Sequence, residues 1–443
     1  MGNLSTPESV RNLQTALQVK AKAEPEFRFY ALYDKLYRED VLLTAYRKCR
    51  ANKGAPGVDG QTFDDIESYG RERWLGELAQ ALKEQSYRPQ AIKRVYIPKP
   101  NGKRRPLGLS CLRDRVCMMA MVLILEPIFE VDLPKEQYGY RPGVSAHDAL
   151  TSIRNGLCEG YPEVVDADLS SYFDTIPHHE LMLCIARRIV DSRILHLIKR
   201  WLESAVEETD GRGRKKRTTI NKDEGIGIPQ GSPLSPLLAN LYMRRFILGW
   251  KTCRATRQMD VRIVTYADDL VILCRSGQAE SALTEMRNLM TRLKLQINEE
   301  KTRTCNIGRD HFDFLGYTFG SYYSKRTGGA YIGLRPSKKS IHRVVVSLRG
   351  LTNRKTTWLE ATELVADINR VLGGWANYFS IGTTSDAYRA IEAYCVMRMR
   401  RWLQHKHKSR RNGMLEYPYE YLFGPLGLIR PSARRSNQPW AKA

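Results

Sequence analysis

VRIVTYADDLVILC, residues 261–274, places two adjacent aspartates between two apolar runs. The β-branched and aliphatic residues on either side predict two strands, so Asp268 and Asp269 lie at the tip of a hairpin. Charges of one sign repel each other, and a fold tolerates the pair only where water or a cation faces it. Taken alone, this stretch leaves two interpretations open, a turn exposed to water or part of a cation site.

A third carboxylate is available on another predicted strand. Because successive side chains of a strand point to opposite faces, a cluster of three carboxylates needs a contribution from elsewhere in the chain. The strand EVVDADL, residues 163–169, supplies it at Asp168, which stands at the strand's end, where a neighbouring turn can reach it. Carboxylate oxygens are the ligands that Mg²⁺ prefers, and two such ions can stabilise the attacking and leaving oxygens of a phosphoryl transfer.

The composition is that of a globular protein with a polyanionic partner. The 443 residues, of which 42% are hydrophobic and 27% charged, are enough for two or three domains. The net charge of +23 favours nucleic acid as the partner, with a membrane surface as the second choice. Neither an apolar run of about 18 residues nor a signal-peptide core occurs, so we expect an intracellular protein without membrane association. The nine cysteines form no C-x-x-C pair, which argues against a zinc site and against a disulfide framework.

The local patterns predict several elements. Residues 1–50 have the amphipathic spacing of helices. Residues 91–100 and 101–109 predict a hairpin with a basic tip. Residues 236–250 predict a helix that has Ser235 as its N-cap and a proline at its first position.

The last third of the chain is more basic than the rest. Residues 335–411 contain sixteen Lys and Arg against five Asp and Glu, a net charge of +11, and we interpret them as a separate helical module. The strongest helix, residues 385–408, has one apolar stripe formed by Tyr388, Ile391, Cys395, Met399 and Trp402. Its cations lie largely off this stripe: Arg398, Arg400, Arg401, Lys406 and Lys408. A solvated helix face would show the same pattern, but the bias to one sign favours binding of a polyanion.

The order of these segments resembles one protein family. Tyr266-Ala267-Asp268-Asp269 is similar to the Y-x-D-D motif of reverse transcriptases, and DADLSSYFDTI is similar to their first catalytic-aspartate motif. Seven blocks follow in the family's order: IPKP with RRPLGL, YGYRPGVSAHDAL, DADLSSYF, IPQGSPLSPLLAN, YADD, LQINEEKT and FDFLGY. GGWANYFSIGTTSDAYRAIEAY resembles the maturase domain. With nearly the whole chain covered, the sequence is identified as a member of the bacterial group II intron-encoded reverse transcriptases.

The resemblance implies an α+β fold, the right-hand polymerase, with fingers, a palm built on an antiparallel sheet and a helical thumb. It divides the chain into an N-terminal helical extension (1–50), fingers and palm (51–330), a thumb or maturase domain (331–412) and a C-terminal tail (413–443).

The resemblance also assigns roles to single residues. Asp168, Asp268 and Asp269 are the implied catalytic triad and, with the backbone of Leu169, the implied ligands of two Mg²⁺ ions, for which Mn²⁺ could substitute. Lys301 is implied to protonate pyrophosphate as it leaves. An exposed lysine at this position is equally compatible with no catalytic role.

Further residues are implied to contact the incoming nucleotide: Lys99, Arg105, Phe173, Gln230 and Gly231. Lys99 and Arg105 would hold the triphosphate, one as a point charge and the other as a bidentate fork. Phe173 would exclude a ribose 2′-hydroxyl by overlap, and Gly231 would let the backbone approach the new base pair. The alternatives stay open: a solvated hairpin tip, a core phenylalanine with Tyr172 as the inward ring, and an ordinary proline-rich turn.

Some positions depart from the family's pattern. Ser110 stands where relatives commonly have proline, and Val144 stands where they have arginine, next to Arg141, which is an implied nucleic-acid contact. Neither departure touches the triad. Many relatives also carry an H-N-H endonuclease with cysteine pairs, which this sequence does not show, so we expect priming from an existing 3′ end.

The implied function is RNA-directed DNA synthesis from dNTPs on an RNA template with a DNA primer or target, coupled to binding group II intron RNA and assisting its splicing. The resemblance places this activity at nucleic acid in the bacterial cytoplasm, and the sequence does not indicate the oligomeric state. Two alternatives stay open: a free-standing relative used in repair or phage defence, and a splicing cofactor with a vestigial polymerase. The three retained carboxylates argue against the second. An RNA-copying RNA polymerase fits less well, because that class typically shows G-D-D.

Overall fold

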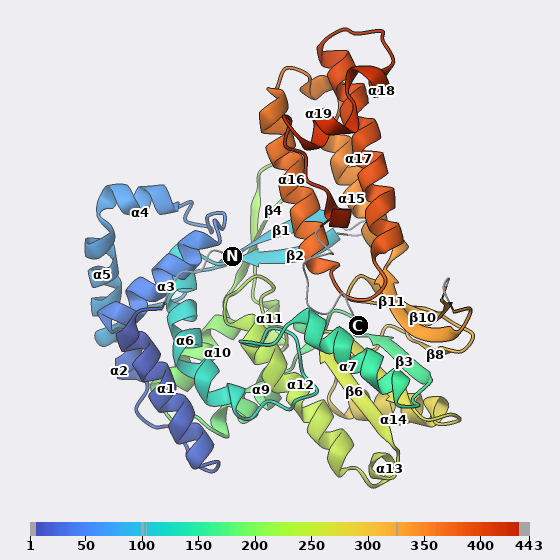
Figure 1. Ribbon diagram of the computed structural model, residues 1–443. Helices are drawn as coiled ribbons and strands as arrows, with labels where there is room; N and C mark the ends of the chain where they lie inside the picture. The colour runs from blue at the N-terminus through green and yellow to red at the C-terminus, as the bar shows by residue number, and fades with distance from the viewer. Residues whose placement is uncertain (1–5, 99–101, 103, 325–326, 434–443) are drawn as a thin grey trace. The chain divides into compact units, whose positions relative to one another are not determined.

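The computed structural model describes residues 6–98, 102, 104–324 and 327–433, and Figure 1 labels most of its elements. The chain forms two compact units. The first unit comprises Met1–Ala149 and Val165–Thr304, and the second comprises Leu150–Val164 and Cys305–Ala443. Each unit has a hydrophobic core cluster of its own.

The N-terminal part of the first unit is helical, as its amphipathic spacing predicts. The helices are α1 (Glu8–Ala23), α2 (Tyr33–Leu36), α3 (Glu39–Ala51), α4 (Phe63–Tyr69), α5 (Arg71–Lys83) and α6 (Leu112–Glu130). Helix α6 is apolar on nearly all sides and is buried along most of its length, with α1 and α3 packed against it. Arg188 ties the end of α1 to this unit, because its buried guanidinium donates to the carbonyls of Ala21 and Glu24 at 2.7 and 3.0 Å.

The predicted basic hairpin is confirmed and belongs to a four-stranded sheet. Strands β1 (Ile92–Pro98) and β2 (Arg104–Leu109) pair antiparallel, and the strand order is β2-β1-β4-β5. Strand β4 (Val206–Thr209) pairs parallel with β1 and antiparallel with β5 (Lys215–Thr218).

A second four-stranded sheet has the order β6-β7-β3-β8 and carries the aspartates. Its strands are β3 (Glu163–Asp168), β6 (Val261–Tyr266), β7 (Asp269–Cys274) and β8 (Arg303–Asn306). The hairpin expected from VRIVTYADDLVILC is confirmed, since β6 and β7 pair antiparallel from Val261 with Cys274 to Tyr266 with Asp269. This sheet is the palm of the implied polymerase fold.

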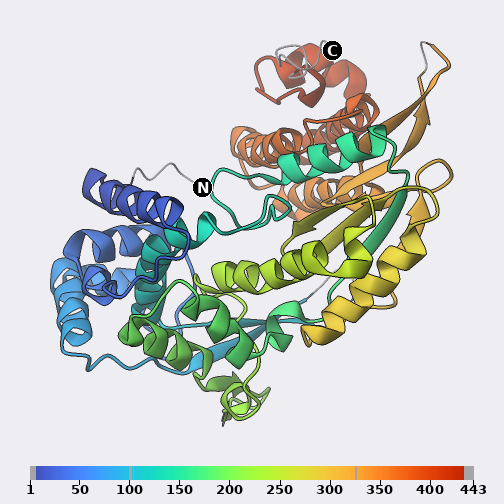
Figure 2. The same cartoon turned by 90° about the horizontal axis from the view of Figure 1, so that it is seen from below.

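Two long helices accompany the palm strands, as the view from below shows (Figure 2). Helix α14 (Ala279–Arg292) packs against β7 and against α12 (Ser235–Thr252). The predicted N-cap of α12 is wrong by one residue. Ser235 is itself the first helical residue, and its hydroxyl donates to the carbonyl of Pro229 at 2.8 Å instead of capping the helix.

The remaining helices before Cys305 are shorter, and the first of them lies mostly in the second unit. They are α7 (Ala146–Cys158), α8 (Tyr172–Thr175), α9 (His178–Ala186), α10 (Ser192–Leu202), α11 (Ile220–Asp223) and α13 (Arg254–Arg257). No helix in the described ranges is both long and apolar enough to cross a membrane.

The second unit joins a small sheet to a helical bundle. The sheet has the order β11-β10-β9, from strands β9 (Phe312–Phe314), β10 (Tyr317–Tyr323) and β11 (Ala330–Pro336). The helices are α15 (Lys338–Leu351), α16 (Ala361–Tyr378), α17 (Ser385–Lys406), α18 (Gly413–Glu416) and α19 (Tyr419–Phe423), with a 3₁₀ turn at Arg354–Thr356. Helix α15 packs against both α16 and α17.

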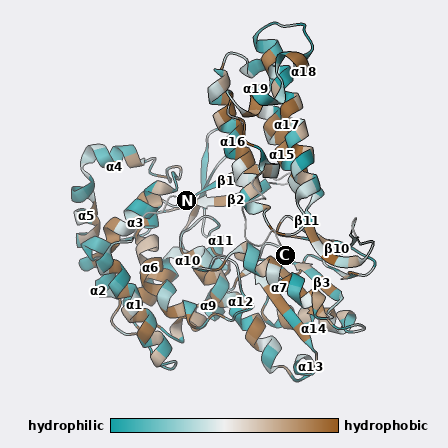
Figure 3. Cartoon of the chain, viewed as in Figure 1, coloured by the Kyte–Doolittle hydropathy of each residue, from teal (hydrophilic) through white to brown (hydrophobic). Residues whose placement is uncertain are grey.

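The apolar stripe predicted for α17 is confirmed. Its five members, Tyr388, Ile391, Cys395, Met399 and Trp402, are all buried. Figure 3 shows apolar residues alternating with polar ones along this helix. The domain boundaries expected at residues 50, 330 and 412 stay predictions, and the chain passes between the two compact units after Ala149, Val164 and Thr304.

Candidate active site

A two-residue turn, Ala267 and Asp268, joins β6 to β7, because Tyr266 and Asp269 form the last pair of the ladder. Ala267 has a φ of +58°, a conformation that non-glycine residues rarely adopt. The segment around Gly139 lies against this turn, and a Cβ atom added at Gly139 would lie 2.5 Å from the backbone nitrogen of Ala267. Glycine is therefore required at position 139 for the turn to keep this conformation.

Asp168 ends β3 and is held by a turn from farther along the chain. The Nζ atom of Lys301 lies 2.7 Å from Oδ2 of Asp168, and Nδ2 of Asn298 donates to the same oxygen at 3.2 Å. The backbone nitrogen of Asn298 also donates to the carbonyl of Asp168 at 2.8 Å. Sequence reasoning missed Asn298, although it stands three residues before Lys301 in a turn-forming stretch.

Burial and the negative charges of β3 raise the pKa values of Asp268 and Asp269. Burial, together with the negative charges of Asp268, Asp168 and Asp166, raises the pKa of Asp269 to about 7. Burial is also the main reason why the pKa of Asp268 is raised. The palm therefore concentrates negative charge in a poorly hydrated place, which a bound cation would neutralise.

The donor set fits a divalent cation. Three carboxylates and the backbone at Leu169 offer the oxygen atoms that hard cations prefer, and the raised pKa of Asp269 is what such a group shows when its neighbours are anionic. Across the ranges that the structure describes, no three His, Cys, Asp or Glu side chains already stand in the arrangement of a metal site. The ammonium group of Lys301 contacts Asp168 instead.

Of the two cations predicted to hold a triphosphate, Lys99 lies outside the described residues. Arg105 lies on β2, opposite Ile97 in the hairpin, and is exposed. Its positive charge counteracts the rise in the pKa of Asp268 and of Tyr140, so it lies within electrostatic range of the turn.

Tyr172 and Phe173 have distinct environments. Tyr172 is 2% exposed, and its hydroxyl donates to the carbonyl of Ala239 at 2.7 Å. Phe173 is only partly buried and meets Tyr172 edge to face, with 5.7 Å between the ring centroids. Tyr172 is thus a core residue, and Phe173 is the more accessible of the two rings.

Gln230 and Gly231 lie beside β2. The carbonyl of Gln230 accepts from the backbone nitrogen of Gly108 at 2.7 Å, and its side chain donates to Asp174 at 3.0 Å. Gly231 has a φ of +108°, and a Cβ atom there would lie 2.9 Å from the carbonyl oxygen of Gly108. Close backbone approach therefore explains this glycine without any ligand.

The expectation that Arg141 binds nucleic acid is not supported, because its guanidinium is used inside the protein. The Nε and Nη2 atoms donate to Glu130 at 2.9 and 2.6 Å, and Nη1 donates to the carbonyls of Pro134 and Gln137, both at 2.8 Å. The Arg141 side chain is only 11% exposed.

If these cations bound a polyanion as one group, they would have to be exposed together, but the structure does not show this for α17. Arg400 is buried, and its Nε donates to the carbonyl of Tyr417 at 2.9 Å. Arg398 donates to the hydroxyl and carbonyl of Thr352, and Lys406 donates to the carbonyl of Leu359 at 2.8 Å. Only two members of the predicted group are exposed, Arg401 and Lys408.

Comparison with known proteins assigns the part of the chain that carries the palm sheet to a known family. Residues 97–319 match the family described as Reverse transcriptase (RNA-dependent DNA polymerase). The chain belongs to the reverse transcriptase family. Residues 341–417 of this reverse transcriptase match the family described as Group II intron, maturase-specific domain. The implied right-hand α+β fold and the implied family are both confirmed, and the chain is a reverse transcriptase of the group II intron-encoded type.

Individual relatives cover different shares of the reverse transcriptase. Protein YkfC of Escherichia coli (strain K12) is 32% identical over 348 residues, which are 70% of this chain and 87% of YkfC. The group II intron-encoded protein LtrA of Lactococcus lactis subsp. cremoris is 32% identical over 279 residues, 62% of this chain and 42% of LtrA. The putative COX1/OXI3 intron 1 protein of Saccharomyces cerevisiae is 25% identical over 338 residues, 65% of this chain and 39% of that protein.

Proposed function

We propose that this reverse transcriptase extends a DNA primer on an RNA template with dNTPs and Mg²⁺, and that it binds group II intron RNA and assists its splicing in a bacterial cytoplasm. The observation that carries the polymerase half is the convergence of Asp168, Asp268 and Asp269 within one sheet, with Lys301 beside them.

The residues of the palm divide the chemistry between them. Asp168, Asp268 and Asp269 would hold divalent cations, which stabilise negative charge on the reacting phosphate when bound. Lys301 forms an ion pair with Asp168, and its ammonium group would donate a proton to the leaving pyrophosphate. Arg105 offers a fork of donors to the triphosphate.

Two further groups select the nucleotide in this proposal. The partly buried ring of Phe173, supported edge to face by Tyr172, would occupy the space that a ribose 2′-hydroxyl needs. The segment of Gln230 and Gly231 is fixed by the hydrogen bond from Gly108 and would support the new base pair with its backbone.

The maturase half of the proposal rests on the second unit. Residues 341–417 match the maturase-specific family, and residues 335–411 have a net charge of +11 from sixteen cations and five anions. An RNA is the polyanion that this charge suits.

Primer extension by Asp268→Asn tests the proposal. The substitution removes a charged metal ligand and should lower the extension rate by at least about a hundredfold, while affinity for a primer–template duplex stays near that of the wild type. Asp260→Asn, at the exposed far end of β6, is the matched control and should extend normally. Robust Mg²⁺-dependent extension by Asp268→Asn would refute the assignment.

A further inference from the structure

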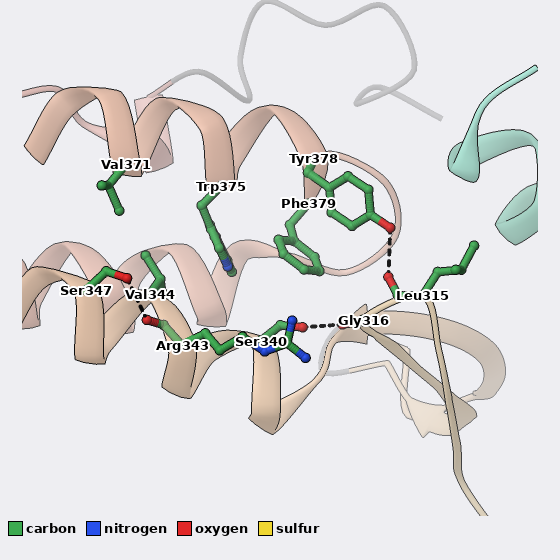
Figure 4. Close-up of a pocket in the computed structure, with 10 residues that line it drawn as sticks. All are labelled: Leu315, Gly316, Ser340, Arg343, Val344, Ser347, Val371, Trp375, Tyr378 and Phe379. Atoms are coloured by element: carbon green, nitrogen blue, oxygen red, sulfur yellow. Dashed lines mark hydrogen bonds between the residues drawn. The ribbon is translucent and has the colours of Figure 1, made fainter. Parts of the chain in front are cut away.

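A cavity of about 560 Å³ lies within the second unit, between α15 and α16, and is closed at one end by Leu315 and Gly316 (Figure 4). This volume is in the range of small-molecule sites. None of the roles assigned above uses this cavity.

The walls of the cavity are fixed. Gly316 has a φ of +81°, and the hydroxyl of Ser340 donates to its carbonyl at 2.8 Å. The hydroxyl of Tyr378 donates to the carbonyl of Leu315 at 2.8 Å. The ring of Trp375 packs against that of Phe379, with 4.8 Å between the centroids. A ligand would therefore meet a preformed aromatic wall.

Two polar groups in the cavity have no hydrogen-bond partner among the residues that the structure describes. The Nε1 atom of Trp375 is buried and has no hydrogen-bond partner, and Figure 4 shows it at the tip of the indole, directed from α16 toward α15. An indole N–H can only donate, and leaving it unpaired costs about 1–3 kcal/mol. The guanidinium of Arg343 lines the same cavity, on an exposed side of α15, with no hydrogen bond or ion pair to the described residues.

We propose that this cavity binds one unstacked nucleobase of a single-stranded RNA. The indole offers a flat surface and a donor to a base carbonyl or ring nitrogen, and Arg343 offers a charged fork to the adjoining phosphate. The charge of the surrounding module favours a nucleotide over an apolar peptide side chain. The proposal rests on the proposed function only in taking RNA as the polyanion.

Binding of oligouridylate of about 12 nucleotides, compared with an abasic oligoribose phosphate of equal length, tests the proposal on the full-length protein. Wild type should bind the oligouridylate more tightly. Trp375→Phe keeps an aromatic ring and removes the N–H donor. It should therefore reduce the ratio of the two affinities by about three- to tenfold. Arg343→Gln should weaken both ligands by a similar factor, because it acts on the phosphate.

Two substitutions are matched controls. Trp358→Phe removes an indole N–H from a ring that is 76% exposed, and Arg349→Gln removes an exposed arginine of α15 that does not line the cavity. Trp358→Phe should leave the difference in affinity between the two ligands unchanged, and Arg349→Gln should weaken binding of either ligand less than Arg343→Gln does. If Trp375→Phe fails to fold, Ser347→Phe fills the cavity from an exposed position of its wall and should have the same effect.

Cross-linking locates the base. An oligouridylate with one 5-iodouridine should cross-link to the segments around Trp375 or Arg343. Cross-links confined to other segments would overturn the proposal. So would an equal preference for the base-containing ligand in Trp375→Phe and Trp358→Phe. Displacement of the probe by apolar peptides but not by free uridylate would also overturn it. Primer extension is measured on the same samples. If the wild type does not extend a primer but still binds the oligouridylate in a base-dependent way, the result counts against the proposed function and not against this cavity.

Discussion

Tyr172 and Phe173 are neighbours in the chain with different tasks. The sequence could not say which ring faces the nucleotide, because both are large aromatic residues that follow the same aspartate. Burial favours Phe173 in our proposal, because the hydroxyl of Tyr172 donates to the carbonyl of Ala239 inside the core, whereas Phe173 is only partly buried.

Phe173→Ala should admit ribonucleotides. Removing the ring opens space for a 2′-hydroxyl, and discrimination between dNTP and rNTP should fall by at least about tenfold in single-nucleotide incorporation. Tyr172→Phe is the control, because it keeps the ring and loses only the bond to Ala239, which lowers the free energy of unfolding by about 1 kcal/mol. A loss of discrimination in Tyr172→Phe but not in Phe173→Ala would contradict the prediction.

Asp269 links cation binding to pH. Millimolar Mg²⁺ should raise the thermal midpoint of the wild type by about 2–4 °C, and Asp269→Asn should abolish this gain. Because the pKa of Asp269 is about 7, its carboxyl is largely protonated at pH 6, and the cation must displace that proton. The gain should therefore be smaller at pH 6 than at pH 8.

The control for this measurement is Asp64→Asn, an exposed aspartate of α4, which should keep the full response to Mg²⁺. A shift that is independent of pH, or one that Asp269→Asn retains, would show that the cation binds elsewhere.

At the scale of elements, α17 shows what a sequence pattern can and cannot predict. Its apolar stripe was predictable because helical periodicity alone places those residues on one face. The environment of its cations depends on other segments: Arg400, for example, donates to the carbonyl of Tyr417 and stacks on the ring of Tyr419. Such long side chains bury their stems against whatever packs beside them, which periodicity does not record.

Arg400→Gln should lower the free energy of unfolding by about 2 kcal/mol, since it breaks a buried charged hydrogen bond. Arg401→Gln, one residue further on and exposed, should change it by less than about 0.5 kcal/mol. Urea denaturation monitored in the second unit makes the comparison. Equal effects of the two substitutions would argue that Arg400 is not a structural tie.

Arg401 and Lys408 are the members of the predicted cationic group that remain for RNA. Replacing both with Gln should reduce the slope of log K against log salt by about 1.5, without a measurable change in stability. Filter binding of intron RNA between low and moderate salt gives the slope. An unchanged slope would show that these two cations are only solvated.

At the scale of the whole molecule, two separate core clusters underlie the two units. One is built from residues between Val10 and Leu295, and the other from residues between Val344 and Leu428. A chain with two cores of this kind is expected to unfold in more than one step.

Leu372→Ala removes a side chain that is 1% exposed in the second core and should lower the stability of that unit by about 3 kcal/mol. Leu238→Ala is the counterpart in the first core. In calorimetry, each substitution should shift one transition and leave the other in place. A single transition that both substitutions shift equally would mean that the units unfold together.

The fold was predictable to the extent that local patterns and block order determine it. The palm hairpin, the basic hairpin and the α17 stripe follow from periodicity and turn residues. Arg141 and Asn298 could not be assigned in the same way: the guanidinium of Arg141 bonds to carbonyls exposed by a turn four to seven residues earlier, and Asn298 meets Asp168 from 130 residues away. The first depends on the conformation of a local turn and the second on a long-range contact, and neither leaves a visible pattern in one sequence.

The tight packing of Gly139 on the turn at Ala267 bears on how such elements decay in genomes. Every single-base change in a glycine codon that yields another amino acid adds a Cβ atom, and here that atom would displace the backbone that carries Asp268. A copy of the gene with such a change would keep all of its aspartates and its maturase segment while DNA copying fails. A genome survey that counts intact catalytic motifs would classify this copy as able to move to new sites. The copy could in fact only be inherited at its existing site.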